Sequence, residues 1–298
     1  MATKVVELVN NGVLSVEKKY GMSYEEFAKD HLFGDYPVVI GDACKEWTAK
    51  EKFTPEFFKS EYGNRKVEVQ GQEYNLKDFI EIMEESTMDN PAPYPCKLQI
   101  DRDYPELIPD ISPRFMYAKP DWCHNPMVEP LLGNADTYEI FLGSPGGQFP
   151  YVHYDYLGLH AFITQLYGVK EFTVIPPDQT PYVYPKENNS WVSEVPDIKN
   201  VDLEKYPLCA NITPITFTVG PGETLFIPNG WWHTAKSLTV TISVALDSLN
   251  TSNWERFKME VTTKVDNKTN AAVAKMVGAY LSVAGGVLRR TKNKVRQA

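Results

Sequence analysis

Cysteine and histidine are scarce in this chain, which has four cysteines and five histidines among 298 residues. No two cysteines form a CxxC pair, so the spacing typical of zinc ribbons and of disulfide-stapled domains is absent. Cys123 and His124 are neighbours whose side chains would diverge on a regular element, which argues against a second metal site there. We expect reduced core residues at Cys44, Cys96, Cys123 and Cys209.

Signals for export and for membrane insertion are also lacking. Residues 1–7 hold no charged segment followed by an apolar one, and no apolar run approaches the roughly 18 residues of a membrane span. We therefore expect an intracellular protein, cytoplasmic or nuclear, that does not act in a membrane.

The net charge of −9 is unevenly distributed along the chain. Residues 252–298 carry ten Lys/Arg and three Asp/Glu, a net charge of +7, which leaves −16 on residues 1–251. An acidic body does not favour nucleic acid as a partner. The basic segment 289–296 is compatible with an acidic protein, RNA or a membrane surface, but it also has the composition of a solvated helix end, which we favour.

Three regions are distinguished by their patterns. Residues 1–135 hold helix signals and short strands that would flank and extend a barrel, and residues 136–250 alternate short strands with Gly and Pro turns. Residues 251–298 are helical. The middle region has the pattern of an all-β barrel or sandwich, so the fold class we predict is mainly β with flanking helices.

Helix starts in the first region are marked by capping residues. Ser23 and Glu26 form a capping-box pattern, Thr54-Pro55 supplies an N-cap and a first-turn proline for a helix that ends at Gly63, and Asn75 is a further N-cap candidate. Apolar or alternating segments predict strands at 37–40 and 66–70.

A long insertion interrupts the strands of the middle region. Residues 178–214 are too many for a hairpin and are rich in Pro, Asn and aromatics, and such insertions are often binding loops. We expect Tyr182, Tyr184 and Trp191 to lie near a substrate or to pack the loop down, and packing is the better expectation for any one of them.

The most informative group is His153, Asp155 and His233. One intervening residue puts His153 and Asp155 on the same face of a β-strand, because side chains alternate with a period of two. His233 comes much later, after an apolar strand and a turn. Two imidazoles and one carboxylate leave three open positions on an octahedral ion, as in non-heme Fe(II) oxygenases, although a His-x-Asp pair alone is a weak signal.

Lys170 adds a charge inside the predicted barrel. It follows the strand-like segment 159–167 and a turn at Gly168, and it opens the next strand, 170–175. An unpaired buried ammonium costs several kcal/mol, so this lysine needs an anionic partner.

These residues stand within longer motifs that resemble the JmjC family of oxygenases. The motifs are His153-x-Asp155, Lys170 after its glycine turn, Ile175-Pro-Pro-Asp-Gln179, Val219-Gly-Pro-Gly-Glu-Thr-Leu-Phe-Ile-Pro228 and Trp231-Trp-His233. The similarity runs from about residue 37 to about residue 250. It is greatest to the small hydroxylase branch that includes the asparaginyl hydroxylase inhibiting hypoxia-inducible factor.

The resemblance implies a double-stranded β-helix that uses Fe(II), 2-oxoglutarate and O₂. His153, Asp155 and His233 would hold the metal, and Lys170 would pair with the C5 carboxylate of 2-oxoglutarate. Tyr94 and Ser243 fall where relatives donate hydroxyl groups to the same carboxylate, although tyrosines in Pro-rich loops and serines in strands are commonly structural.

The chain also departs from the family pattern. Pro150 stands where relatives commonly have Thr or Ser, and the asparagines near the C1 carboxylate are replaced by Ala161 or Ile163 and by Ala245. Gln165, Tyr151 or water would have to fill the gap. A catalytically silent scaffold is therefore an alternative to the enzyme.

Among oxygenase functions, the first expectation is hydroxylation of a protein side chain. Hydroxylation of a small molecule or an RNA nucleoside is second, and lysine demethylation is third, because no chromatin-reading module is recognisable. The sequence does not identify the target atom.

The helical region 251–298 carries the prediction of self-association. Trp254, Phe257 and Val261 lie on one stripe, and 271–288 is rich in small and apolar residues, too apolar to stay solvated. Related hydroxylases dimerise through C-terminal helices, so we expect a homodimer here.

Overall fold

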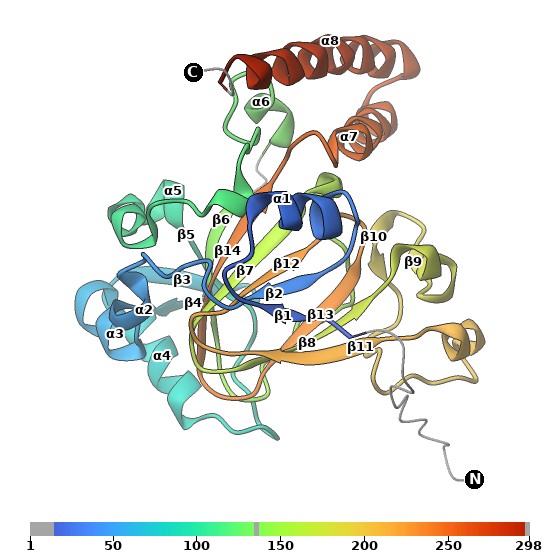
Figure 1. The fold of residues 1–298 in the computed structure, drawn as a ribbon. Coiled ribbons are helices and arrows are strands. Elements are labelled where there is room, and N and C mark those ends of the chain that lie inside the picture. The colour runs from blue at the N-terminus through green and yellow to red at the C-terminus, as the bar shows by residue number, and fades with distance from the viewer. Residues whose placement is uncertain (1–14, 134–136, 296–298) are drawn as a thin grey trace.

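Two β-sheets that share one apolar core form the centre of the molecule (Figure 1). The computed structural model describes residues 15–133 and 137–295, with side chains described as far as residue 290. The larger sheet has seven strands, in the order β1 (Lys18–Lys19), β2 (Val38–Ile40), β12 (Thr224–Ile227), β7 (His160–Tyr167), β14 (Thr241–Ser248), β6 (Tyr138–Gly143) and β5 (Cys96–Gln99). The smaller has three, β11 (Ile215–Val219), β8 (Lys170–Ile175) and β13 (Trp232–Ser237).

Strand pairing confirms the predicted fold class, mainly β with flanking helices, and is consistent with a jelly roll. Every pair of neighbours in these two sheets is antiparallel except β1 with β2. Side chains from both sheets, including Ala161 and Leu225 on the larger and Phe172 and Val174 on the smaller, pack into one buried cluster. The sheets therefore face each other, and any cavity between them is lined by inward positions of both.

The N-terminal region covers the outside of the large sheet and also extends it with β1, β2 and β5. Its remaining elements are α1 (Tyr24–Phe27), a π-helical turn (Ala28–Leu32), α2 (Ala49–Lys52), α3 (Pro55–Tyr62), the hairpin β3 (Lys66–Val69) and β4 (Gln72–Asn75), α4 (Leu76–Glu85), α5 (Ile100–Asp103), η2 (Pro105–Ile111), η3 (Met116–Ala118) and α6 (Glu129–Leu132).

Two of the three predicted caps are confirmed. Ser23 Oγ accepts from the backbone N–H of Glu26 at 3.1 Å, and Thr54 Oγ1 accepts from that of Phe57 at 3.2 Å. Asn75 occupies the N-cap position of α4 without capping it, and that part of the prediction is wrong. Its amide donates instead to the Asp78 carboxylate at 2.8 Å, and a charged acceptor makes the stronger hydrogen bond.

The insertion forms a small unit with its own core. It contains η5 (Pro177–Tyr182), β9 (Pro185–Lys186), β10 (Asn189–Ser193) and η6 (Pro207–Asn211), and its apolar cluster includes Val183 and Ile198. Tyr182 and Tyr184 pack against that cluster, as the packing alternative predicts. Trp191 also packs there, and it reaches the cavity described below.

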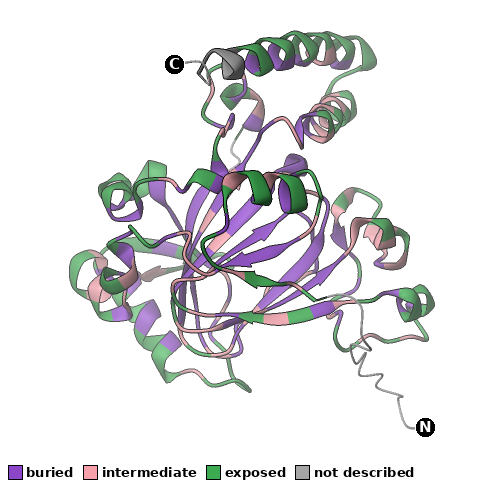
Figure 2. Cartoon of the chain, viewed as in Figure 1, coloured by how far each residue is buried: buried purple, intermediate pink, exposed green. Residues whose placement is uncertain are grey.

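The C-terminal helices form an arm at one end of the barrel (Figure 1). In α7 (Trp254–Lys268) the predicted stripe Trp254, Phe257 and Val261 is buried. The next helix, α8 (Ala271–Val295), buries Leu281 and Ala284 and is otherwise largely exposed (Figure 2).

One segment of α8 corrects an expectation from the sequence. Ala271–Arg290 is long and apolar enough to cross a membrane by length and composition alone, with only 22% of its most apolar window buried. The prediction that no such segment exists is wrong, because Lys275 is the only charged residue between 271 and 288. The many Ala, Gly and Ser residues of this segment make it less evidently apolar than a run of large side chains.

Candidate active site

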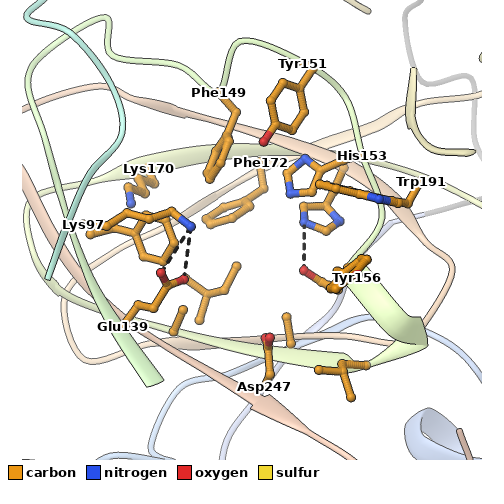
Figure 3. Close-up of a pocket in the computed structure, with 18 of the residues that line it drawn as sticks. Lys97, Glu139, Phe149, Tyr151, His153, Tyr156, Lys170, Phe172, Trp191 and Asp247 are labelled. Carbon is orange, nitrogen blue, oxygen red and sulfur yellow. Dashed lines mark hydrogen bonds and ion pairs between the residues drawn. The ribbon is translucent and has the colours of Figure 1, made fainter. Parts of the chain in front are cut away.

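A cavity of about 280 Å³ lies between the sheets (Figure 3), and five of the six predicted site residues line it. The sixth, Ser243, contacts Lys170. The walls of the cavity come from β6, β7 and β14 of the large sheet, from β8 and β13 of the small sheet, and from segment 149–156 and Trp191. This volume is just below the about 300–1,000 Å³ usual for small-molecule sites, so the cavity suits a small ligand and one inserted group.

His153, Asp155 and His233 meet at one side of the cavity. Each offers a ligand atom, and the three atoms lie within 4.8 Å of one another. His153 and His233 are held by two backbone hydrogen bonds, from His153 N to His233 O at 3.1 Å and from His233 N to His153 O at 2.6 Å. The backbone pairing of two distant segments therefore fixes the separation of the imidazoles.

The local structure of the first pair differs from the prediction. His153 forms isolated bridges with Val192 and His233, and Asp155 lies beyond any strand. The insertion and β13 each pair with this segment at only a few points, so no continuous ladder forms. His153 and Asp155 both line the cavity nonetheless, as the spacing predicted.

His233 is oriented by its own turn. Its Nδ1 lies 3.0 Å from the carbonyl oxygen of Trp231, to which the ring donates, and its Nε2 faces Asp155 Oδ1 at 3.8 Å. A backbone acceptor at one ring nitrogen leaves the lone pair of the other for a metal. The turn before β13 passes through Gly230 at φ +80°, a conformation that favours glycine.

The environment of these residues fits a divalent cation. Burial, and then the neighbouring His233, lowers the pKa of His153 well below its ordinary value, which keeps that imidazole neutral as a ligand must be. Burial raises the pKa of Asp155, and Asp155 Oδ2 is buried without a hydrogen-bond partner. A buried acceptor without a partner is costly, and a bound cation would satisfy it.

Lys170 lies at the opposite end of the cavity, where Tyr94 and Ser243 also lie. Its Nζ donates to Ser243 Oγ at 2.6 Å and to Tyr94 Oη at 3.3 Å, and it stands 5.6 Å from the centre of the Tyr94 ring. Within the described ranges no carboxylate pairs with it, and burial lowers its pKa to about 7. The structure thus brings together an ammonium and two hydroxyl groups that await an anion.

The departures from the family pattern line the wall between these two ends. Ala161, Ile163 and Ala245 face the cavity, so no amide replaces the missing asparagines there. Gln165 is not part of the lining, and its amide donates to the carbonyl of Tyr167 at 2.6 Å. Of the two side chains considered as substitutes, only Tyr151 reaches the cavity.

Sequence reasoning missed three charged residues of this site. Lys97 and Glu139 form an ion pair at 3.2 Å on the cavity wall, and Gln99 donates to the same carboxylate at 2.7 Å. Asp247 points into the cavity from β14, and burial with repulsion from Asp155 raises its pKa well above the ordinary value. The period of two along β14, from Ser243 through Ala245, was the signal that would have found Asp247.

Among the described residues, Cys123 and His124 belong to no group of three or more possible metal ligands. His124 Nε2 lies 2.7 Å from an Arg114 guanidinium nitrogen, and Cys123 is buried. Among the residues that the structure describes, the His153 group is the single cluster with metal-ligand geometry. The cysteines at 44, 96, 123 and 209 are free and buried, as predicted.

Comparisons with known proteins agree with this geometry. The family model of the cupin-like domain matches residues 24–249. Over 80% of its length the chain is 27% identical to lysine-specific demethylase JMJ21 of Arabidopsis thaliana, of which it covers 26%. Over 78% it is 27% identical to lysine-specific demethylase 8 of Xenopus tropicalis, of which it covers 52%.

A third relative carries two activities in its name. Over 78% of its length the chain is 26% identical to the bifunctional arginine demethylase and lysyl-hydroxylase psr-1 of Caenorhabditis elegans, of which it covers 60%. The chain thus spans between about a quarter and three fifths of these relatives. Fold, site geometry and similarity agree: the chain belongs to the family of cupin-like domains, within the JmjC oxygenase superfamily.

Proposed function

We propose that the protein is an Fe(II)- and 2-oxoglutarate-dependent oxygenase that hydroxylates a protein side chain. The observation that carries the proposal is one cavity with a His-Asp-His cluster at one end and, at the other, a buried lysine that pairs with no carboxylate among the described residues. Three protein ligands leave open positions for a cosubstrate, and the lysine supplies a positive charge for its far end.

The residues at the two ends of the cavity would have different roles. His153, Asp155 and His233 would hold Fe(II), which when bound supplies the O₂ activation that couples conversion of 2-oxoglutarate to succinate and CO₂ with hydroxylation of a C–H bond. Lys170, with Ser243 and Tyr94 beside it, would bind the C5 carboxylate. The apolar wall of Ala161, Ile163 and Ala245 excludes water beside the reacting atoms.

A second hollow supports a polypeptide as the substrate. It has a volume of about 430 Å³, lies between α7 and segment 188–191, and shares Tyr156 and Trp191 with the first cavity. Chain on either side of a target residue would therefore lie in this second hollow while the residue itself enters the first cavity. The charge of −16 on residues 1–251 also favours a protein over nucleic acid.

Demethylation is the second candidate, and the names of the relatives favour it, since two are lysine-specific demethylases and one combines both activities. Hydroxylation of an N-methyl carbon releases formaldehyde, so the two outcomes differ only in the carbon attacked. The relatives do not single out the asparaginyl-hydroxylase branch.

Turnover and product analysis test the proposal together. With Fe(II), O₂ and 2-oxoglutarate, the wild type should form succinate and His153→Ala should not. Incubation with a cell lysate should then give peptides that gain one oxygen atom, or lose a methyl group with release of formaldehyde, only with the wild type. Absence of succinate formation from metal-loaded wild type would indicate the silent scaffold.

A further inference from the structure

The hollow beside the active-site cavity carries an excess of positive charge. It has a volume of about 430 Å³ and lies between α7 and segment 188–191 of the insertion. The charged residues of its lining all come from α7: three cations, Arg256, Lys264 and Lys268, and one acid, Glu260, which leaves a net charge of +2. This sign is opposite to the −16 that residues 1–251 carry, so the hollow is a local reversal of charge on an acidic protein.

Two of these cations have no anionic partner within the described ranges. Arg256 Nε donates to Glu260 Oε1 at 2.7 Å, so these two residues neutralise each other. The other ion pairs of α7 involve Glu255, and no described carboxylate pairs with Lys264 or Lys268. An anionic group that enters the hollow would therefore meet two ammonium groups that are available to pair with it.

Lys264 stands at the boundary between the hollow and the active-site cavity. Its Nζ lies 4.8 Å from the centre of the Tyr156 ring, and this cation–π contact holds the ammonium over a residue that lines both spaces. Trp191 also lines both, and its ring centroid lies 5.6 Å from that of Tyr156. Figure 3 shows Tyr156 and Trp191 on the same side of the cavity as His153. A polypeptide whose target residue enters beside the metal cluster would thus pass Lys264.

The spacing of the two lysines fits alternate residues of an extended peptide. Lys264 and Lys268 lie on one face of α7, one helical turn and about 6 Å apart along the axis. Side chains two residues apart share one face of an extended chain and are separated by about 7 Å. A peptide that lies along α7 would therefore present two acidic side chains, separated by one residue, to the two ammonium groups.

We propose that this hollow binds an acidic segment next to the target residue, in which two Asp or Glu side chains separated by one residue pair with Lys264 and Lys268. This inference rests on the proposed function, and it names the chemistry of the substrate's flank rather than that of the target residue. Complementary charge at this position favours the correct partner, and like charge excludes a substrate with a basic flank.

Peptide binding by the full chain tests the proposal. The probes are fluorescent peptides in which Glu-Ser-Glu, Gln-Ser-Gln or Lys-Ser-Lys flanks a randomised centre on both sides, measured by anisotropy on protein loaded with Ni(II) and 2-oxoglutarate. The wild type should bind the Glu-Ser-Glu pool at least about fivefold more tightly than the Gln-Ser-Gln pool at low ionic strength. Because the pairs lie at the surface, salt should weaken this preference.

Charge reversal identifies the residues responsible. Lys264→Glu with Lys268→Glu should reverse the preference toward the Lys-Ser-Lys pool, a result that loss of folding would not produce. The matched control, Lys29→Glu with Lys77→Glu, changes the net charge equally at exposed positions outside the hollow and should bind like the wild type.

The outcomes separate this inference from the proposed function. Absence of succinate formation by the wild type would refute the function, whereas the flank preference is read from binding alone. Equal binding of the three pools by the wild type would overturn the inference. An unchanged preference in the charge-reversed variant, or the same reversal in the control, would overturn it as well.

Discussion

The barrel cavity and the C-terminal arm use their side chains in opposite ways. In the cavity, residues of both sheets line the same space, and Lys170 of the small sheet donates to Ser243 of the large sheet. In the arm, α8 packs one stripe of Leu281, Ala284 and Leu288 against the rest of the protein and leaves another uncovered. Met276 and Val283 on that second stripe are 72% and 66% exposed.

The cavity is lined by residues of one chain, whereas one apolar stripe of α8 is covered by nothing in that chain among the described residues. The exposed stripe of α8 comprises Val273, Met276, Tyr280, Val283 and Val287, with steps of three and four residues. That spacing is the seam of helix-on-helix packing, whose period is 3.5 residues. We therefore propose that a second copy covers α8, whereas the barrel site is complete within one chain.

The sharpest test of a self-contained site is removal of one candidate metal ligand. Asp155→Ala should abolish conversion of 2-oxoglutarate to succinate by more than about a hundredfold, because changes to groups that merely orient ligands already cost about 10–100-fold. The barrel should still fold, because the substitution removes a carboxylate oxygen that is buried without a hydrogen-bond partner. Fe(II) affinity by calorimetry and the thermal midpoint check both points, and wild-type turnover in the variant would refute the metal assignment.

At the other end of the cavity, Lys170→Ala should weaken the binding of 2-oxoglutarate. Loss of one partner of a buried ion pair costs about 2–5 kcal/mol, so the apparent KM for 2-oxoglutarate should rise by at least about thirtyfold. Fe(II) affinity should change little. Lys186→Ala, at an exposed position on β9, is the matched control, and an unchanged KM in Lys170→Ala would transfer the role to another residue.

Because of the pKa of Lys170, binding of 2-oxoglutarate should depend on pH. Burial lowers that pKa to about 7, so the ammonium of the empty site is present below pH 7 and is lost as the pH rises above it. The Kd for 2-oxoglutarate should therefore increase above pH 7, by up to about tenfold per pH unit. Lys170→Arg stays protonated, and any binding that it retains should show a flat profile. A flat profile in the wild type would contradict the assignment.

The smallest effect on turnover is expected in the arm. Met276→Glu with Val283→Glu should convert a homodimer to a monomer in light scattering, because two carboxylates would be buried in an apolar seam. Lys275→Glu, which changes the net charge equally from an exposed position off the stripe, should remain a dimer. Turnover should fall little in either variant. A wild type that is monomeric at micromolar concentration would show that α8 needs no second copy.

A feature could be predicted from the sequence where the residues that cause it lie close together along the chain. The turn at Gly168 placed Lys170 at the start of β8, and the N-cap Thr54 with the proline after it placed the start of α3, because each signal depends on residues close in sequence. The capping role of Asn75 failed because a neighbouring carboxylate competed for its amide. Asp247 could be found only by extending the period of two from Ser243 through Ala245, because nothing else in its local sequence distinguishes it from any other strand aspartate.

The resemblance of the chain's motifs predicted the oxygenase superfamily from the sequence alone, and spacing and periodicity predicted the metal-ligand candidates and the helical stripe of α7. Tertiary structure decided which groups share a space. Lys170 meets Tyr94 and Ser243 from positions 76 and 73 residues away, and His153 meets His233 through an antiparallel bridge between distant segments. Such contacts depend on which strands pair and in which register, a choice set by the packing of the whole core.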